Sequence, residues 1–109
     1  MTQNNSQGVQ MSNPIENLNK IFDSRVRLGI MSTLMVNDEI NFNDLKQLIN
    51  VTDGNLASHI KSLEESGYVK VNKGFVGRKT NTTYIVTKMG EKAFQQHLQA
   101  LEKMIKTMK

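Results

Sequence analysis

Residues 43–67, NDLKQLINVTDGNLASHIKSLEESG, contain two helical patterns separated by a short break. Asn43 is a suitable N-cap for a short helix over Asp44–Ile49, because its side chain can accept a hydrogen bond from a free backbone N–H. Thr52 can cap a second helix over Asp53–Glu65 in the same way. Only two residues separate the first helix from the second cap, so the stretch predicts two helices joined by a tight turn.

The second of these helices is amphipathic. Leu56, Ile60 and Leu63 recur at helical spacing and predict a face that packs on the core. The opposite face carries short polar side chains and one lysine, with Asn55 on its flank. Gly67 follows the last turn, where glycine readily adopts the left-handed conformation that closes a helix.

A β-hairpin is predicted directly after the helix pair. After the helix, the apolar residues follow an alternating period over Tyr68–Val76 and over Thr83–Thr87. This pattern predicts two antiparallel strands. The intervening segment Gly77–Thr82 is polar and includes Arg78 and Lys79, so it predicts a loop with a basic tip. A helix, a tight turn, a helix and a hairpin in this order are typical of a helix-turn-helix followed by a wing.

The remaining elements flank this unit. Asn13 and Pro14 indicate a helix start, with asparagine as the N-cap and proline at the first helical position. A second helix is predicted over about residues 23–36, a very short strand over residues 40–42, and a long final helix over about residues 88–107.

These patterns predict an α+β, mainly helical fold. It is a winged helix-turn-helix with a two- or three-stranded antiparallel wing sheet and N- and C-terminal dimerisation helices. Residues 1–13 are rich in Asn, Gln and Ser and predict a disordered tail, and residues 14–109 predict one domain. The expected core is centred on Leu45, Leu56, Ile60, Leu63 and Val86.

The charge is unevenly distributed along the 109 residues. Five basic and eight acidic residues precede Gly67, a net charge of −3, whereas nine basic and two acidic residues follow from there, a net charge of +7. A segregated positive half indicates a polyanionic partner, most often nucleic acid.

Several functional classes are excluded by composition. The chain has no cysteine, which removes disulfides, thiolate metal sites and thiol catalysis, and two histidines are too few for most metal sites. No catalytic set or nucleotide-binding loop is present, so we expect neither an enzyme nor a cofactor. There is no apolar run near the roughly 18 residues of a membrane span and no secretory signal pattern, so we expect a cytoplasmic protein without membrane contact.

The candidate DNA-binding residues lie on the second helix of the pair and on the wing. A helix fits the major groove, where Asn55 can pair with adenine and Ser58 can contact several bases. A basic wing can reach phosphates or the narrow minor groove. His59 is expected to be a packed, hydrogen-bonded residue at the edge of this face. The full set is Thr52, Gly54, Asn55, Ser58, His59, Lys61, Ser62, Lys70, Lys73, Arg78, Lys79, Thr80 and Asn81.

Two runs resemble a known family. ASHIKSLEESGYV over residues 57–69 resembles the recognition helix of winged-helix regulators of the MarR/ArsR group. GFVGRK over residues 74–79, with TTY at 82–84 and TKMG at 87–90, resembles a small single-domain MarR-like subfamily. The resemblance covers about residues 15–105 and implies a dimeric, sequence-specific transcription regulator. The cysteine ligands of the metal-sensing ArsR branch are missing, so the resemblance names no inducer.

Apolar positions near both chain ends predict a homodimer. On the final helix they follow steps of four and three residues, and the helix over 23–36 is apolar on two sides, so one side needs cover from another helix or a second subunit. The expected interface residues are Ile15, Leu18, Phe22, Leu28, Met31, Met35, Phe94, Leu98, Leu101, Ile105 and Met108. His97 is expected at this interface or on the surface.

A two-fold dimer places two recognition helices about one DNA turn apart, roughly 34 Å, which matches a palindromic operator on double-stranded DNA. The alternative function is a winged-helix adaptor that binds proteins rather than DNA. The feature that separates the two is the basic tip Arg78-Lys79 beside the polar face of the recognition helix, where an adaptor would carry an exposed apolar patch.

Overall fold

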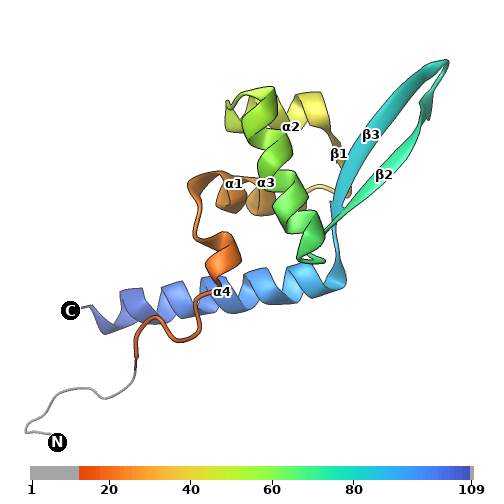
Figure 1. Ribbon diagram of the computed structural model, residues 1–109. Coiled ribbons are helices and arrows are strands. Elements are labelled where there is room, and N and C mark those ends of the chain that lie inside the picture. Colours follow the sequence, from red (N-terminus) through yellow and green to blue (C-terminus); the bar gives the residue numbers. More distant parts are fainter. Residues whose placement is uncertain (1–12, 109) are drawn as a thin grey trace, which may run out of the picture.

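The computed structural model describes residues 13–108, and the predicted tail lies outside these residues except for Asn13. In chain order the elements are the 3-10 helix η1 (Lys20–Phe22), α1 (Arg25–Met35), β1 (Ile40–Asn41), α2 (Phe42–Ile49), α3 (Asp53–Glu65), β2 (Val69–Val76), β3 (Lys79–Val86) and α4 (Lys88–Thr107). Figure 1 shows α1–α3 as one cluster, with the β2–β3 hairpin projecting on one side and α4 running along the opposite end. This is the predicted winged-helix fold.

The sheet has three antiparallel strands in the order β1-β3-β2. β2 and β3 pair along their whole length, from Val69 opposite Val86 to Val76 opposite Lys79, and β1 adds Ile40 opposite Tyr84. The half of the hairpin next to the helices is the buried half, with Val69 and Tyr84 in the core.

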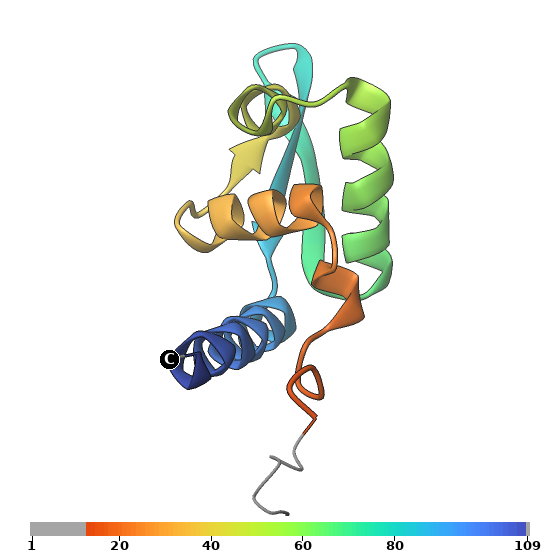
Figure 2. The same ribbon diagram turned by 90° about the vertical axis from the view of Figure 1, so that its left-hand side faces the viewer.

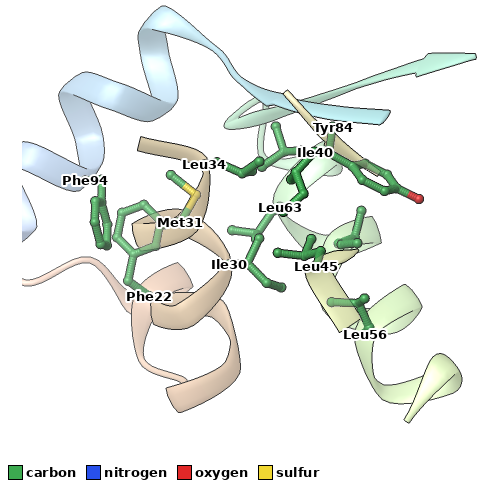
Figure 3. Close-up of a cluster of buried hydrophobic side chains, with 12 residues drawn as sticks. Phe22, Ile30, Met31, Leu34, Ile40, Leu45, Leu56, Leu63, Tyr84 and Phe94 are labelled. Carbon is green, nitrogen blue, oxygen red and sulfur yellow. The ribbon is translucent and has the colours of Figure 1, made fainter. Parts of the chain in front are cut away.

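The core lies between the helix cluster, the base of the hairpin and the first half of α4. Figure 3 shows two connected groups, one around Leu45, Leu56 and Tyr84, and the other around Met31 and the Phe22 and Phe94 rings. The buried members are Phe22, Ile30, Met31, Leu34, Ile40, Leu45, Leu56, Ile60, Leu63, Val69, Tyr84 and Phe94. Of the five predicted core centres, four are buried and Val86 is half-buried against them.

Both apolar sides of helix α1 pack against the core of its own subunit. Ile30, Met31 and Leu34 are buried, and Leu28 and Met35 are half-buried against the same core. The assignment of Met31 to a dimer interface is therefore wrong, because Met31 is buried in the same core cluster as Phe22 and Phe94 of its own subunit.

Helix α4 is fixed to the end of α3 by Thr87. Its Oγ1 donates to Gly67 O at 2.7 Å and accepts from Gly90 N at 2.9 Å, and its N–H donates to Tyr68 O. Gly67 has a φ of +81°, and the N–H of Tyr68 returns to Leu63 O, so α3 ends as the glycine predicts.

Three local predictions are wrong. The Asn13–Pro14 segment forms turns rather than a helix, because the side chains of Asn13 and Asn19 bind the backbone N–H groups two residues on. Helix α2 begins at Phe42 instead of Asp44, and the predicted strand ends at Asn41, because Asn41 is the N-cap. Its Oδ1 accepts from Asp44 N, and its Nδ2 donates to Asp44 Oδ2.

The third wrong prediction concerns the wing loop. Gly77 and Arg78 alone make the turn, since Val76 pairs with Lys79 and residues 79–82 belong to β3. Gly77 has a φ of +64° and Arg78 does not have a positive φ, as in a type II′ hairpin turn. The β-branched threonines after the turn favour the longer strand.

Candidate nucleic-acid interface

The helix-turn-helix is fixed by contacts at its turn. Asn50 ends α2 in the left-handed conformation, with its N–H bonded to Lys46 O at 2.8 Å. Thr52 Oγ1 accepts from Asn55 N and caps α3. Lys46 Nζ lies 2.7 Å from the Asp53 carboxylate, which joins the two helices by an ion pair.

The face of α3 opposite the core is polar and free of apolar cover. Gly54, Asn55, Ser58 and Lys61 are exposed, and a Cβ added at Gly54 would meet nothing within 4 Å. Ser62 is half-buried, and its Oγ donates to Ser58 O at 3.3 Å. Every large exposed apolar side chain among residues 13–108 lies outside α3.

His59 is held at the edge of this face by α1. Its Nδ1 accepts a hydrogen bond from Arg27 Nε at 3.0 Å, while Arg27 Nη1 donates to Ile21 O. Burial, and then the nearby Arg27 charge, lower the pKa of His59. A neutral ring whose Nδ1 is an acceptor carries its proton on Nε2, so His59 offers a donor. The role of Arg27 was missed by sequence reasoning, because nothing in the spacing links position 27 to position 59.

The wing carries charge of one sign. Lys70, Lys73, Arg78 and Lys79 are exposed, and residues 69–86 contain no acidic residue. Because side chains alternate along a strand, Lys73 lies on the hairpin face that continues the core, and Lys70 lies on the other. Of the two remaining predicted wing residues, Thr80 is exposed and Asn81 is half-buried.

The start of α3 and the wing tip reach the same end of the molecule. Figures 1 and 2, related by a rotation about the vertical axis, both place the wing tip, α2 and the beginning of α3 at the top and α4 at the bottom. The fold therefore brings the start of α3, with Gly54 and Asn55, and the wing tip, with Arg78 and Lys79, to one end, distant from the last helix. Lys61 and Ser62 lie in the second half of α3, and Lys70 lies at the base of the hairpin.

A family model described as a winged helix DNA-binding domain matches residues 26–105. The chain belongs to this family. The resemblance to winged-helix regulators found in the sequence is thereby confirmed.

Relatives support the assignment of this winged-helix domain. An uncharacterized protein from Methanocaldococcus jannaschii is 39% identical over 79 residues, which cover 72% of this chain and 86% of that protein. A transcriptional regulator homologue from Pyrococcus horikoshii OT3 is 34% identical with a TM-score of 0.72, over 81% of this chain and 87% of that chain. Bacillus subtilis PadR in complex with operator DNA has the same fold, with a TM-score of 0.61 and 16% identity over 68% of this chain and 46% of that chain.

The second candidate surface of the winged-helix domain is α4. Its first half packs on the core, so Phe94, Phe22 and Met31 are buried within one subunit and their assignment to a dimer interface is wrong. His97, expected at the interface or surface, is 6% exposed and accepts a hydrogen bond from Asn19 N. The first half of this 20-residue helix is buried on the core of its own subunit, and this explains both corrections.

The other predicted interface residues are exposed or half-buried in the single subunit. Leu98 is 43% exposed and Ile105 is 66% exposed, and Met108 and Ile15 are also exposed. The half-buried members of the set are Leu18, Leu28, Met35 and Leu101. Figure 1 shows the C-terminal part of α4 extending beyond the helix cluster.

No helix within residues 13–108 has the length and apolarity that crossing a bilayer requires.

Proposed function

We propose that this protein is a sequence-specific, double-stranded DNA-binding transcriptional regulator that acts as a homodimer on a palindromic operator. The observation that carries the proposal is the pairing of a polar, uncovered α3 face with an acid-free basic wing at the same end of the molecule. Duplex DNA requires both, because base edges are read in the major groove and phosphates flank it.

The chemistry of α3 suits base recognition. Asn55 and Ser58 are short, exposed side chains near the beginning of the helix, where recognition helices contact base edges. Gly54 leaves room for close backbone approach at the same end, and helix N-terminal N–H groups favour a phosphate. The neutral His59 presents its Nε2 proton beside them as a further donor.

A homodimer is supported by α4. An apolar stripe of Leu98, Leu101, Ile105 and Met108 continues along α4 after the core no longer covers it. Burying such a stripe against a second copy removes apolar area from water, at about 25 cal/mol per Å². Two copies joined at this end present two α3 helices on the far side, and an operator for such a dimer has two-fold symmetry. The PadR structure with operator DNA supports the use of this fold on DNA.

The adaptor alternative fits the surface less well. A protein-binding α3 would expose large apolar side chains, and α3 exposes none among its described residues. The function is therefore assigned to DNA binding.

A salt titration tests the proposal. The purified protein selects duplexes from a random-sequence pool, and its affinity for the selected duplex is measured against salt concentration. Replacing Arg78 and Lys79 with Ala should reduce the slope of log affinity against log salt by about 1–2 units per subunit, because phosphate contacts are lost. The control, Lys103→Ala with Lys106→Ala, removes the same charge from the polar face of α4 and should leave the slope unchanged. Failure to enrich any duplex would reject DNA binding.

A further inference from the structure

Two apolar side chains stand exposed beside the wing turn. Phe75 is 75% exposed and Val76 is 67% exposed, although the basic residues of the wing surround them. A solvated hairpin tip needs neither residue, because the type II′ turn depends on Gly77. The DNA-binding role assigned to Arg78 and Lys79 does not explain them either.

The two side chains face in opposite directions. Phe75 pairs with Thr80 and continues the core-facing side of the hairpin, whereas Val76 pairs with Lys79 on the other side. A flat protein surface would cover one side of the hairpin and leave the other in water. A groove with two walls covers both sides at once.

The charge around Phe75 and Val76 indicates which kind of groove would hold them. Four basic residues and no acidic residue occur between Val69 and Val86. Such a segment is attracted to a groove lined by phosphates. In the minor groove, apolar side chains placed against the sugars or between base steps are a known means of contact.

On the basis of the proposed function, we propose that Phe75 and Val76 enter the DNA minor groove beside the half-site read by α3 and select base pairs that lack a minor-groove amino group. A G·C pair presents the guanine N2 amino group there, whereas A·T presents only acceptors. Against an apolar side chain that amino group loses its water without gaining an acceptor, which disfavours G·C under the wing.

The first experiment changes only the DNA. In the duplex selected by the full-length protein, base pairs under the wing are made G·C or inosine·C, which differ only by the guanine amino group in the minor groove. The wild-type protein should bind the inosine duplex about tenfold more tightly, a factor within the range for one discriminated base pair. Equal affinities for the two duplexes would overturn the inference, and this test requires no protein variant.

The second experiment changes only the side chains. Phe75→Thr with Val76→Thr places residues of high β-propensity at both positions, so the hairpin is retained, as circular dichroism would show. The variant should bind the selected duplex about tenfold more weakly or worse, because a buried aromatic contact is lost, and it should no longer distinguish inosine from guanine. Its salt slope should stay at the wild-type value, unlike that of the Arg78 and Lys79 variant.

The outcomes separate this inference from the function on which it rests. A wild-type protein that binds no duplex rejects both. A wild-type protein that binds a selected duplex, with a threonine variant of equal affinity, rejects the minor-groove contact alone. If the threonine variant instead loses a complex with a second protein or the dimeric state while its DNA affinity is unchanged, the apolar tip is a protein contact and the inference is wrong.

Discussion

His97 shows how a buried polar side chain joins the chain ends. Its Nδ1 accepts a hydrogen bond from Asn19 N at 3.0 Å, and its ring lies 5.3 Å from that of Phe22. Burial lowers the pKa of His97, and the nearby Asp23 carboxylate opposes this shift. The N-terminal segment is thus bound to α4 through a histidine that is neutral in the folded chain.

The first prediction at the residue scale concerns acid stability. Because the pKa of His97 is lowered on folding, the unfolded chain binds more protons, and stability increases with pH in this range. The contribution is complete above the unfolded value of 6.5 and is lost as the pH falls below it. The melting temperature of the wild-type protein should therefore drop between about pH 7.5 and about pH 5.5.

The variant His97→Gln isolates this effect. Glutamine offers a carbonyl oxygen as acceptor and does not titrate, so the decrease over the same pH range should be smaller. His59→Gln is a comparison and not an unaffected control: because the pKa of His59 is also lowered, its replacement should reduce the decrease as well. An identical decrease in wild-type protein and His97→Gln would show that His97 does not control acid stability.

The second residue-scale prediction concerns base reading. The side chains of Asn55 and Ser58 are exposed, and neither forms a hydrogen bond with another side chain among residues 13–108. The variant Asn55→Ala with Ser58→Ala should therefore fold normally. Discrimination between the selected and random duplexes should fall by about 1–3 kcal/mol per lost base contact, while non-specific affinity persists. Competition binding measures this, with Gln95→Ala and Gln99→Ala on α4 as the control. If the double variant keeps full discrimination between the two duplexes, these side chains do not read bases.

At the scale of elements, the junction of α3, β2 and α4 determines how the domain holds its last helix. Thr87 bonds to the residues that end α3, and Gly90 lies directly on the backbone of Tyr68. A Cβ built at Gly90 would overlap the Tyr68 carbonyl oxygen, so only glycine allows this approach. The start of α4 is therefore fixed by the hydrogen bonds of Thr87 and by the backbone contact at Gly90.

Two glycine substitutions test this junction against an open site. Gly90→Ala should lower the free energy of unfolding by about 1–3 kcal/mol, because backbone must move to admit the methyl group. Gly54→Ala, also in a first helical turn but with nothing within 4 Å, should raise it by about 0.5–1 kcal/mol. Urea denaturation of the two variants gives both values. Equal changes would mean that α4 does not rest on Tyr68 as described.

At the scale of the whole molecule, the apolar stripe of α4 has two environments. Its first half completes the core through Phe94 and His97, and its second half exposes Ile105 and Met108. The start of α3 and the wing tip lie at the opposite end of the molecule from α4. Contact between two copies through α4 would therefore leave both wings accessible (Figure 2).

The prediction at this scale concerns the dimer. Leu98→Glu with Ile105→Glu places charge in the proposed contact but outside the buried core, so each subunit should fold and sediment as a monomer. Affinity for a palindromic duplex should fall at least about 100-fold, because two linked sites bind far more tightly than one. Gln95→Glu with Gln99→Glu adds the same charge to the polar face of α4 and should remain dimeric. A folded dimer of the Leu98 and Ile105 variant would exclude this stripe from the interface.

The order of elements was available from the sequence alone. Helical spacing of Leu56, Ile60 and Leu63, the Thr52 cap and the Gly67 stop act over a few residues, and their structures agree with the pattern. The basic wing and the polar α3 face are likewise local properties. These signals sufficed for the winged-helix family and for the two groups of candidate DNA-binding residues.

Tertiary structure decided which apolar and polar groups meet. Periodicity marks Met31 and Phe94 as apolar-face residues but does not distinguish a core from an interface, because both bury apolar side chains. The hydrogen bond from Asn19 to His97 joins residues 78 positions apart, and the one from Arg27 to His59 joins residues 32 positions apart. No local pattern encodes such contacts. The exposure of Phe75 depends on how far the hairpin extends from the helices, since the same face of the hairpin carries the buried Val69 at its base.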